Sequence, residues 1–225
     1  MQTVAIILAR QGSKGIPQKN IIDFCGKPLM SWTIDHCRDG GVDAVYVSSD
    51  SDKILEIGEN YGALSIKRPQ EISGDLATSE SGWLHALDII EADKGYFDWV
   101  LAPQVTSPLR TSSDIKRGIE IAQSGNYDSI FSCSISDDFY FWKNRSGILE
   151  SINYDWRNRK RRQDTPNQFI ENGSFYLFRP EVLRQNNNRF GGKIGVLEME
   201  FWKMFEIDSM DDLRMCSALM KEFLI

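Results

Sequence analysis

Short apolar runs and longer segments with helical spacing alternate along the first 135 residues. Continuous apolar runs bounded by polar loops predict strands buried inside a sheet, and apolar positions three or four apart predict helices. The predicted strands are Val4–Ala9, Ala44–Ser48, Leu64–Lys67, Trp99–Pro103 and Ser129–Ile135. The predicted helices are Leu29–Arg38, Asp52–Tyr61, Thr78–Asp93 and Asp114–Ser124. This alternation predicts an α/β fold with a mostly parallel sheet flanked by helices.

The alternation stops between residues 136 and 168. This stretch holds four consecutive aromatic residues, Phe139 to Trp142, and a basic run, Asn158 to Arg162. Exposed aromatic residues bordered by charge are typical of protein interfaces, so we expect a subunit contact here. The remaining predicted elements are the strands Ser174–Phe178 and Lys203–Ile207 and the helix Met210–Phe223. The predicted organisation is one α/β domain, residues 1–136 plus 169–225, with residues 137–168 as a small dimerisation segment.

Composition excludes several classes of protein. The chain has 225 residues, of which 41% are hydrophobic, and its formal charge is -6. Net acidity disfavours sequence-independent nucleic-acid binding, which depends on clustered positive charge. The first apolar run is far shorter than a membrane span and lacks the flanks of a signal peptide. Four scattered cysteines without zinc-site spacing are typical of reduced thiols, so we expect a cytoplasmic protein. From the net charge and the short apolar run, we expect neither nucleic-acid nor membrane partners.

The loop after the first predicted strand is the most informative segment. Between Arg10 and Asn20 it contains three cations, two glycines and a serine. Glycines let backbone N–H groups approach a phosphate, and Lys and Arg neutralise several negative charges together. The spacing matches neither the ATPase P-loop nor the dinucleotide fingerprint. The loop therefore predicts a polyphosphate site of another kind; the alternative is an ordinary solvated basic loop.

The C-terminal part supplies carboxylates. Glu206 is on the predicted strand Lys203–Ile207, and Asp208 comes directly after it. Residues two apart on a strand point to the same face, so both carboxylates are expected to point to one face. Two hard oxygen ligands, completed by substrate phosphates, are how proteins commonly hold Mg²⁺. Asp211 and Asp212 are expected in the first turn of the final helix, where the helix dipole favours them.

Five blocks, in order from Ala9 to Leu213, resemble the sugar-acid cytidylyltransferases. This family comprises the CMP-sialic acid synthetases and their relatives acting on other nine-carbon ulosonic acids. The blocks are Arg10-x-Gly-Ser-Lys-Gly-x-x-x-Lys-Asn20, Arg68-Pro-x-Glu-x-x-x-Asp-x-Ala-x-Ser79, Gln104-Val-Thr-Ser-Pro-Leu-Arg110, Arg162-Gln-Asp-x-Pro166 with Glu171-Asn-Gly-Ser-Phe-Tyr176, and Phe205-Glu-Ile-Asp-Ser-x-Asp-Asp-Leu213. The chain departs from the family pattern in four places. Ile72-Ser73-Gly74 stands where Leu-Ala-x is usual, and Val105 replaces a proline. Ser174 replaces an alanine, and Glu206 stands where aspartate is more frequent.

The resemblance implies a Rossmann-like nucleotidyltransferase that transfers CMP from CTP to the anomeric hydroxyl of a nine-carbon acidic sugar and releases pyrophosphate. Catalytic roles are implied for Arg10, Lys19 and Asp208. Nucleotide binding is implied for Arg10, Gly12, Ser13, Lys14, Lys19, Asn20, Arg68, Ala77 and Ser79. Sugar binding is implied for Gln104, Lys143, Arg162, Glu171 and Tyr176. The resemblance also implies a homodimer, and Mg²⁺ (with Mn²⁺ as an alternative) on Asp208 together with Glu206.

Three alternatives remain open from the sequence. One is an enzyme similar to CMP-Kdo synthetase, which uses an eight-carbon sugar acid. A second is a metal-dependent glycosyltransferase that uses Asp50-Ser51-Asp52, although capping of the following helix explains these residues without a metal and is the favoured interpretation. The third is a module that binds nucleotide without turnover. The sequence leaves undetermined which nine-carbon acid is used and which group acts as a general base.

Overall fold

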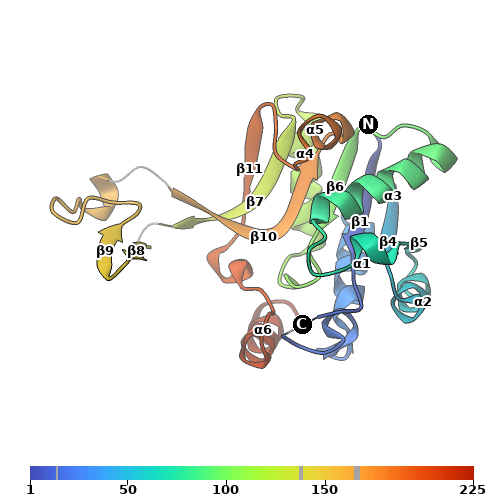
Figure 1. The fold of residues 1–225 in the computed structure, drawn as a ribbon, viewed down its shortest axis with the longest axis horizontal. Coiled ribbons are helices and arrows are strands. Elements are labelled where there is room, and N and C mark those ends of the chain that lie inside the picture. The colour runs from blue at the N-terminus through green and yellow to red at the C-terminus, as the bar shows by residue number, and fades with distance from the viewer. Residues whose placement is uncertain (14, 137–138, 165–167) are drawn as a thin grey trace.

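A seven-stranded sheet forms the centre of the computed structural model, which describes residues 1–13, 15–136, 139–164 and 168–225 (Figure 1). The strand order is β11-β7-β10-β6-β1-β4-β5. Neighbouring strands are parallel except where β10 pairs antiparallel with β6 and β7. The bounds are β1 Thr3–Leu8, β4 Ala44–Ser49, β5 Leu64–Lys67, β6 Trp99–Pro103, β7 Ser129–Ser136, β10 Gln168–Phe178 and β11 Ile194–Glu198. The predicted mostly parallel sheet is confirmed.

Helices cover both faces of this sheet (Figure 1). One face packs against α1 (Leu29–Asp39), α2 (Asp52–Asn60), α4 (Ser112–Gln123) and α6 (Met210–Phe223). The other packs against α3 (Ser79–Lys94) and α5 (Pro180–Asn186). The short elements are η1 (Lys19–Ile21), β2 (Asp23–Phe24), β3 (Lys27–Pro28), η2 (Gln70–Ile72), η3 (Arg162–Asp164) and η4 (Phe201–Met204). The predicted α/β class is therefore correct, with β2, β3, α5 and β11 as elements that the sequence pattern did not reveal.

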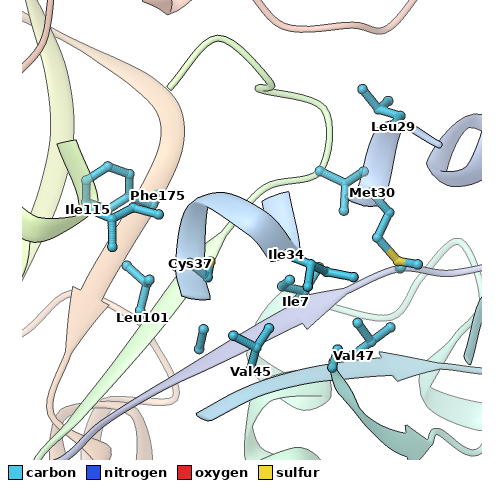
Figure 2. Packing of buried hydrophobic residues seen from close by; sticks show 14 of the residues in the cluster. Ile7, Leu29, Met30, Ile34, Cys37, Val45, Val47, Leu101, Ile115 and Phe175 are labelled. Carbon is cyan, nitrogen blue, oxygen red and sulfur yellow. The ribbon is translucent and has the colours of Figure 1, made fainter. Parts of the chain in front are cut away.

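The two helix layers explain why β1 is apolar at every position from Val4 to Leu8. Ala5 and Ile7 belong to the core beneath α1, whereas Val4 and Ile6 belong to the core beneath α3. Successive side chains of a strand point to opposite faces, so a strand covered on both sides needs apolar residues at every position. In Figure 2, Ile34 and neighbouring side chains of α1 face Ile7 and the adjacent strand.

Arg110 joins the loop that follows β6 to β10. Its guanidinium is fully buried and donates hydrogen bonds to the carbonyl oxygens of Gln104 (2.9 Å) and Ser174 (3.1 Å) and to Oγ1 of Thr33 (2.6 Å). Burial lowers the pKa of Arg110 to about 10, so it stays charged at neutral pH. Because oxygens from the loop, from β10 and from α1 all accept hydrogen bonds from one planar cation, the loop after β6 has a fixed conformation.

The predicted strand Lys203–Ile207 is wrong. Lys203 belongs to η4, and the residues between η4 and α6 form no strand. The edge of the sheet is instead β11, whose residues pair in parallel with β7, Val196 opposite Phe131. Both segments are short and mixed in polarity, and only the available hydrogen-bonding edge decides which one becomes a strand. β10 also begins earlier than predicted, with Gln168 opposite Ser136 at the end of β7.

The chain between β7 and β10 leaves the sheet and projects to one side (Figure 1). It contains the antiparallel hairpin of β8 (Trp142–Arg145) and β9 (Ile148–Ser151). Several large apolar side chains on it are exposed, including Phe141, Trp142 and Trp156. Residues 137–138 and 165–167 of the predicted dimerisation segment lie outside the described residues. Among the helices of the described chain, none combines the length and apolar character that a membrane crossing requires.

Candidate active site

The loop after β1 is closed by a hydrogen bond of its own and is held against two other parts of the chain. The side-chain amide of Asn20 donates to the carbonyl oxygen of Arg10 (2.9 Å), and the backbone N–H of Gln11 donates to Asp50 Oδ1 (2.9 Å). A Cβ atom on Gly15 would lie 2.3 Å from the carbonyl oxygen of Asp208. Only glycine fits this contact, since real Cβ atoms do not approach oxygen so closely. The cationic loop therefore packs directly on the backbone of the acidic segment.

Lys19 and Asp208 meet at this contact. Lys19 Nζ lies 2.8 Å from Asp208 Oδ1, although the two residues are 189 positions apart in the sequence. The Lys19 side chain is 14% exposed and that of Asp208 is 73% exposed, so the pair lies at the rim of the site. Arg10, the other cation of this loop, pairs with Asp75 (2.8 Å). The cations from the beginning of the chain and a carboxylate from its end thus share one location.

The acidic segment, residues 205–208, is fixed by its backbone. The N–H of buried Ile207 donates to the carbonyl oxygen of Thr106 (2.8 Å). The N–H of Asp208 donates to Asp212 Oδ2 (3.1 Å), and Asp212 also completes the capping box of α6 with Ser209. Asp212 therefore lies in the first helical turn, as predicted, while the position of Asp208 comes from these hydrogen bonds rather than from a strand.

Glu206 lies beside β10 in a largely buried position. Burial, followed by repulsion from Asp208, raises its pKa above the ordinary value, and Lys19 and Thr106 oppose this shift. Gly173 has a left-handed backbone (φ 65°), and a Cβ atom there would lie 1.9 Å from Glu206 Oε1. The glycine therefore makes the space that Glu206 occupies, within the irregular part of the β10–β7 pairing.

Two adjoining cavities open beside these residues. The first has a volume of about 250 Å³ and is lined by Leu8, Arg10, Ser13, Lys19, Asn20, Ser79, Trp83, Pro103, Gln104, Val105 and Thr106. The second, of about 280 Å³, is lined by Leu8, Arg10, Arg68, Ile72, Ser73, Gly74, Asp75, Ala77, Thr78 and Ser79. Arg10 and Ser79 line both, so the cavities meet at these side chains. Together they form an elongated site with cations at its centre.

Most of the predicted nucleotide residues line this site. They are Arg10, Ser13, Lys19, Asn20, Arg68, Ala77 and Ser79. Arg68 is buried, donates from Nε to Ser73 Oγ (3.1 Å), and has its pKa lowered by burial. Gly12 is in the same loop but lines neither described cavity. Lys14 lies outside the described residues.

The predicted sugar residues fall into two groups. Gln104 lines the first cavity, and Glu171 and Tyr176 lie on β10, where the Tyr176 hydroxyl donates to Glu171 Oε1 (2.5 Å). Burial and this hydrogen bond raise the pKa of Tyr176. Lys143 is in β8 of the projecting hairpin, with its Nζ 3.2 Å from Glu150 Oε2, and it lines neither of the two cavities. The backbone of Arg162 is in η3, and its side chain lies outside the described part of the chain.

Two further side chains at the site gave no usable sequence signal. Trp83, which the sequence analysis did not assign to the site, lines the first cavity. The guanidinium of Arg189 lies over the rings of Trp83 (5.0 Å) and Tyr176 (4.5 Å) and pairs with Glu80 (3.1 Å). Arg189 stands in a polar loop without a motif, so only the fold places it behind the cavity.

Asp50-Ser51-Asp52 lacks the features of a glycosyltransferase metal site. Asp50 accepts the N–H of Gln11, Ser51 is the N-cap residue of α2, and Asp52 pairs with Lys67. Ser51 has the N-cap position, but its side chain makes no capping hydrogen bond. The contacts of Asp50 with Gln11 and of Asp52 with Lys67 give both carboxylates a structural role, which weighs against the glycosyltransferase alternative.

The residues present fit Mg²⁺ that shares its ligands with a substrate. Within the described ranges, no group of three or more His, Cys, Asp and Glu side chains is arranged to hold a metal by itself. Glu206 and Asp208 are nevertheless close enough for the charge of Asp208 to raise the pKa of Glu206. Mg²⁺ is commonly bound by one or two carboxylates, with waters and substrate phosphates as the other ligands. The pair of carboxylates matches that requirement.

Substitution of Gly15 tests the contact between the two ends of the chain. Gly15→Ala introduces a Cβ atom that clashes with the Asp208 carbonyl oxygen, so we expect turnover to fall by about tenfold to a hundredfold through misplacement of Lys19. Gly12→Ala is the matched comparison, because no heavy atom lies within 4 Å of its added Cβ. Steady-state kinetics on both variants measure the difference. Equal losses in the two variants would contradict a role for the Gly15–Asp208 contact.

Comparisons with known proteins agree with this geometry. A profile of the family described as cytidylyltransferase matches residues 4–219. The chain is 30% identical to pseudaminic acid cytidylyltransferase of Campylobacter jejuni, over 98% of this chain and 97% of that protein. It is 34% identical to N-acylneuraminate cytidylyltransferase A of Danio rerio over 91% of this chain, and the match spans 47% of that longer protein.

A solved structure supports the same fold. CMP:2-keto-3-deoxy-manno-octonic acid synthetase complexed with CTP superimposes over the full length of both chains with a TM-score of 0.74, at 16% identity. That likeness confirms the Rossmann-like α/β architecture. Since the family profile covers nearly the whole sequence, this chain belongs to the cytidylyltransferase family and is a CTP-dependent nucleotidyltransferase.

Proposed function

We propose that the protein transfers CMP from CTP to the anomeric hydroxyl of a nine-carbon acidic sugar of the sialic acid type and releases pyrophosphate. The observation that carries this proposal is the meeting of Lys19 and Asp208 at 2.8 Å, beside two cavities lined by the other nucleotide residues. The names of the relatives, pseudaminic acid and N-acylneuraminate cytidylyltransferases, support the choice of sugar.

The reaction needs positioning and charge neutralisation more than covalent catalysis. The sugar hydroxyl attacks the α-phosphorus in line as pyrophosphate leaves. Arg10, Ser13 and Lys19 hold the triphosphate at the junction of the cavities and stabilise the negative charge that moves to the leaving group. Before substrate binds, Arg10 and Lys19 are paired with Asp75 and Asp208, so phosphate oxygens replace a carboxylate as their partner.

The nucleoside and the sugar occupy opposite ends of the site. The second cavity, with Arg68, Ala77 and Ser79, receives the cytidine, and Asn20 borders the ribose. Gln104, with Glu171 and Tyr176 on β10, receives the hydroxylated sugar, because amide and carboxylate groups pair with hydroxyls.

Asp208 and Glu206 would hold Mg²⁺, with Mn²⁺ as an alternative, together with phosphate oxygens of the substrate. When bound, the ion neutralises charge at the α-phosphate. With the ion bound, Asp208 would serve as a metal ligand rather than as the partner of Lys19, and Lys19 would be available to the triphosphate.

We expect the working form to be a homodimer built by the projecting segment. Phe141, Trp142 and Trp156 are 49%, 44% and 49% exposed there, which is unusual for side chains of this size. In the dimer, Lys143 and Arg162 reach the sugar end of the partner's site. Sedimentation should give a dimer at micromolar concentration, and Trp142→Glu should shift it toward monomer while lowering activity. A fully active wild-type monomer would contradict this arrangement.

The cytoplasm is the proposed location of the reaction. All four cysteines are unpaired, and Cys37, Cys133 and Cys216 are buried. Reduced thiols are typical of the cytosol, where CTP is also available.

Pyrophosphate release tests the proposed function. The purified protein is supplied with CTP and Mg²⁺ and with a panel of nine-carbon acids that includes N-acetylneuraminic, legionaminic and pseudaminic acid. We expect release with at least one of them and none with ATP. Preference for the eight-carbon acid Kdo would favour the CMP-Kdo synthetase alternative, and CTP binding without any release would favour a silent nucleotide-binding module.

A further inference from the structure

A buried ion pair lies at the N-terminus of α4, outside both cavities. Lys203 Nζ is 2.8 Å from Asp114 Oδ2, and the two side chains are only 5% and 2% exposed. Lys203 belongs to η4, which immediately precedes the acidic segment, residues 205–208. The pair therefore connects α4 to the start of the segment that carries Glu206 and Asp208.

Asp114 provides a fixed end for this connection. Its Oδ2 also accepts from the N–H and the hydroxyl of Thr111 (both 2.8 Å), and its Oδ1 accepts from Arg117 (2.8 Å). Burial alone would raise the pKa of Asp114, but the hydrogen bonds from Lys203, Thr111 and Arg117 hold it below its ordinary value. The carboxylate is therefore charged at neutral pH and held in one orientation by both of its oxygens.

Lys203 is bound just as closely. Besides Asp114, its ammonium contacts Glu200 Oε2 (2.7 Å), and its backbone N–H donates to the carbonyl oxygen of Glu200 (2.9 Å). A buried ion pair contributes little net stability compared with apolar residues of similar size, because both charges lose their hydration. What it supplies is a defined geometry, since the ammonium must lie where two carboxylates meet.

The acidic segment is thereby anchored on both sides. Downstream, Asp212 accepts the N–H groups of Asp208 and Ser209; in the middle, Ile207 bonds to the loop after β6. Upstream, the Lys203–Asp114 pair joins η4 to α4, and the N–H of Met199 donates to the carbonyl oxygen of Cys133 on β7 (2.8 Å). We propose that Lys203 and Asp114 are positioning residues, which set the approach of Glu206 and Asp208 to Lys19 and to the metal–triphosphate subsite. This inference rests on the proposed function.

Mn²⁺ binding and kinetics test the proposal in Lys203→Met and Lys203→Arg. In Lys203→Met we expect kcat to fall by about tenfold or more. The Mn²⁺ dissociation constant in the presence of CTP should rise by about tenfold or more, as it does when other residues that orient metal ligands are changed. Electron paramagnetic resonance of free Mn²⁺ measures the binding directly. We expect KM for CTP to change much less, because the cytidine cavity is untouched. Lys203→Arg keeps a cation beside Asp114 and should recover most of both losses.

Ile119→Val is the matched control. Ile119 is a buried residue of α4, and its shortening weakens the packing of that helix while it leaves the Lys203–Asp114 pair intact. We expect unchanged Mn²⁺ binding and kcat in this variant. Wild-type Mn²⁺ binding and kcat in a folded Lys203→Met protein, or equal losses in Ile119→Val, would overturn the proposal. If Lys203→Met does not fold, the double variant Lys203→Met/Asp114→Asn removes both charges together and is held to the same expectations.

Hydrogen exchange separates this proposal from the proposed function. In the ligand-free protein, the Ile207 amide should exchange faster in Lys203→Met, by about tenfold or more if the anchor restrains the acidic segment. This readout needs neither CTP nor metal. Faster exchange in the variant with no pyrophosphate release by the wild type would overturn the proposed function and support the anchor. Unchanged exchange of the Ile207 amide in Lys203→Met, together with pyrophosphate release by the wild type, would overturn the proposed anchor alone.

Discussion

Lys19→Ala is expected to lower kcat by about 10²- to 10³-fold while the fold stays intact. The size of the loss follows from the removal of one charged donor aimed at charge that develops in the transition state. The fold should survive because the Lys19–Asp208 pair has one partner that is 73% exposed, and such pairs contribute about 1 kcal/mol or less to stability. Pyrophosphate-release kinetics, together with a thermal unfolding curve, measure both effects.

Lys53→Ala is the control for this experiment. Lys53 is an exposed lysine of α2 whose Nζ lies 3.2 Å from Gln18 Oε1, so it borders the same loop without lining either cavity. We expect near wild-type activity from it. Comparable losses in Lys19→Ala and Lys53→Ala would mean that general positive charge, rather than the position of Lys19, matters. Normal turnover in Lys19→Ala would remove the loop from the mechanism.

Asp208→Asn should abolish most of the metal-dependent activity, with a loss of about 10²-fold or more. The amide keeps the shape of the side chain but loses the negative charge that pairs with Lys19 and that would attract Mg²⁺. The backbone N–H bond to Asp212 is unaffected by the change, so the segment should keep its path. A titration of activity against Mg²⁺ concentration measures the effect, and we expect the variant to need far more metal for any remaining turnover.

Asp211→Asn is the matched control for the metal titration. Asp211 lies three residues further on, is 89% exposed, and pairs with Arg214 on the surface of α6. Its change removes the same charge from the same neighbourhood without touching the site, so the Mg²⁺ titration should resemble that of the wild type. A wild-type titration for Asp208→Asn would refute its role, whatever the control shows.

β1 and the segment around Lys203 show what a local sequence pattern can predict. The strand predicted for the first is confirmed, and the strand predicted for the second is wrong. β1 is apolar from Val4 to Leu8 because helices cover both faces of the sheet, and such an apolar run is enough to predict a buried strand. The segment around Lys203 has no comparable signal. Residues 203–207 were predicted to form a strand, but the buried ammonium of Lys203 pairs with Asp114 on α4, and β11 forms the sheet edge instead. An ion pair between residues 89 positions apart leaves no trace in a local pattern.

In the candidate site, too, the sequence indicated the residues but not the contacts between them. The cations of the first loop and the carboxylates near the end of the chain were found by residue type and spacing. Their contact depends on Gly15, which lets the loop backbone approach Asp208, and on Gly173, which leaves room for Glu206. The sequence around each glycine does not predict which residue it will contact, because that residue comes from a distant part of the chain.

The sequence by itself determined the α/β class, the order of most elements and the chemistry of the nucleotide residues, because burial patterns, loop cations and carboxylates are local properties. Tertiary structure alone decided that Lys19 meets Asp208, that Arg110 fixes the loop after β6, and that Arg189 lies over the ring of Trp83. It also decided that Lys143 lines neither cavity of its own chain. Each of these depends on the packing of segments that are far apart along the chain. Distances between such segments are set by the whole sheet and its helices, and not by any one stretch of residues.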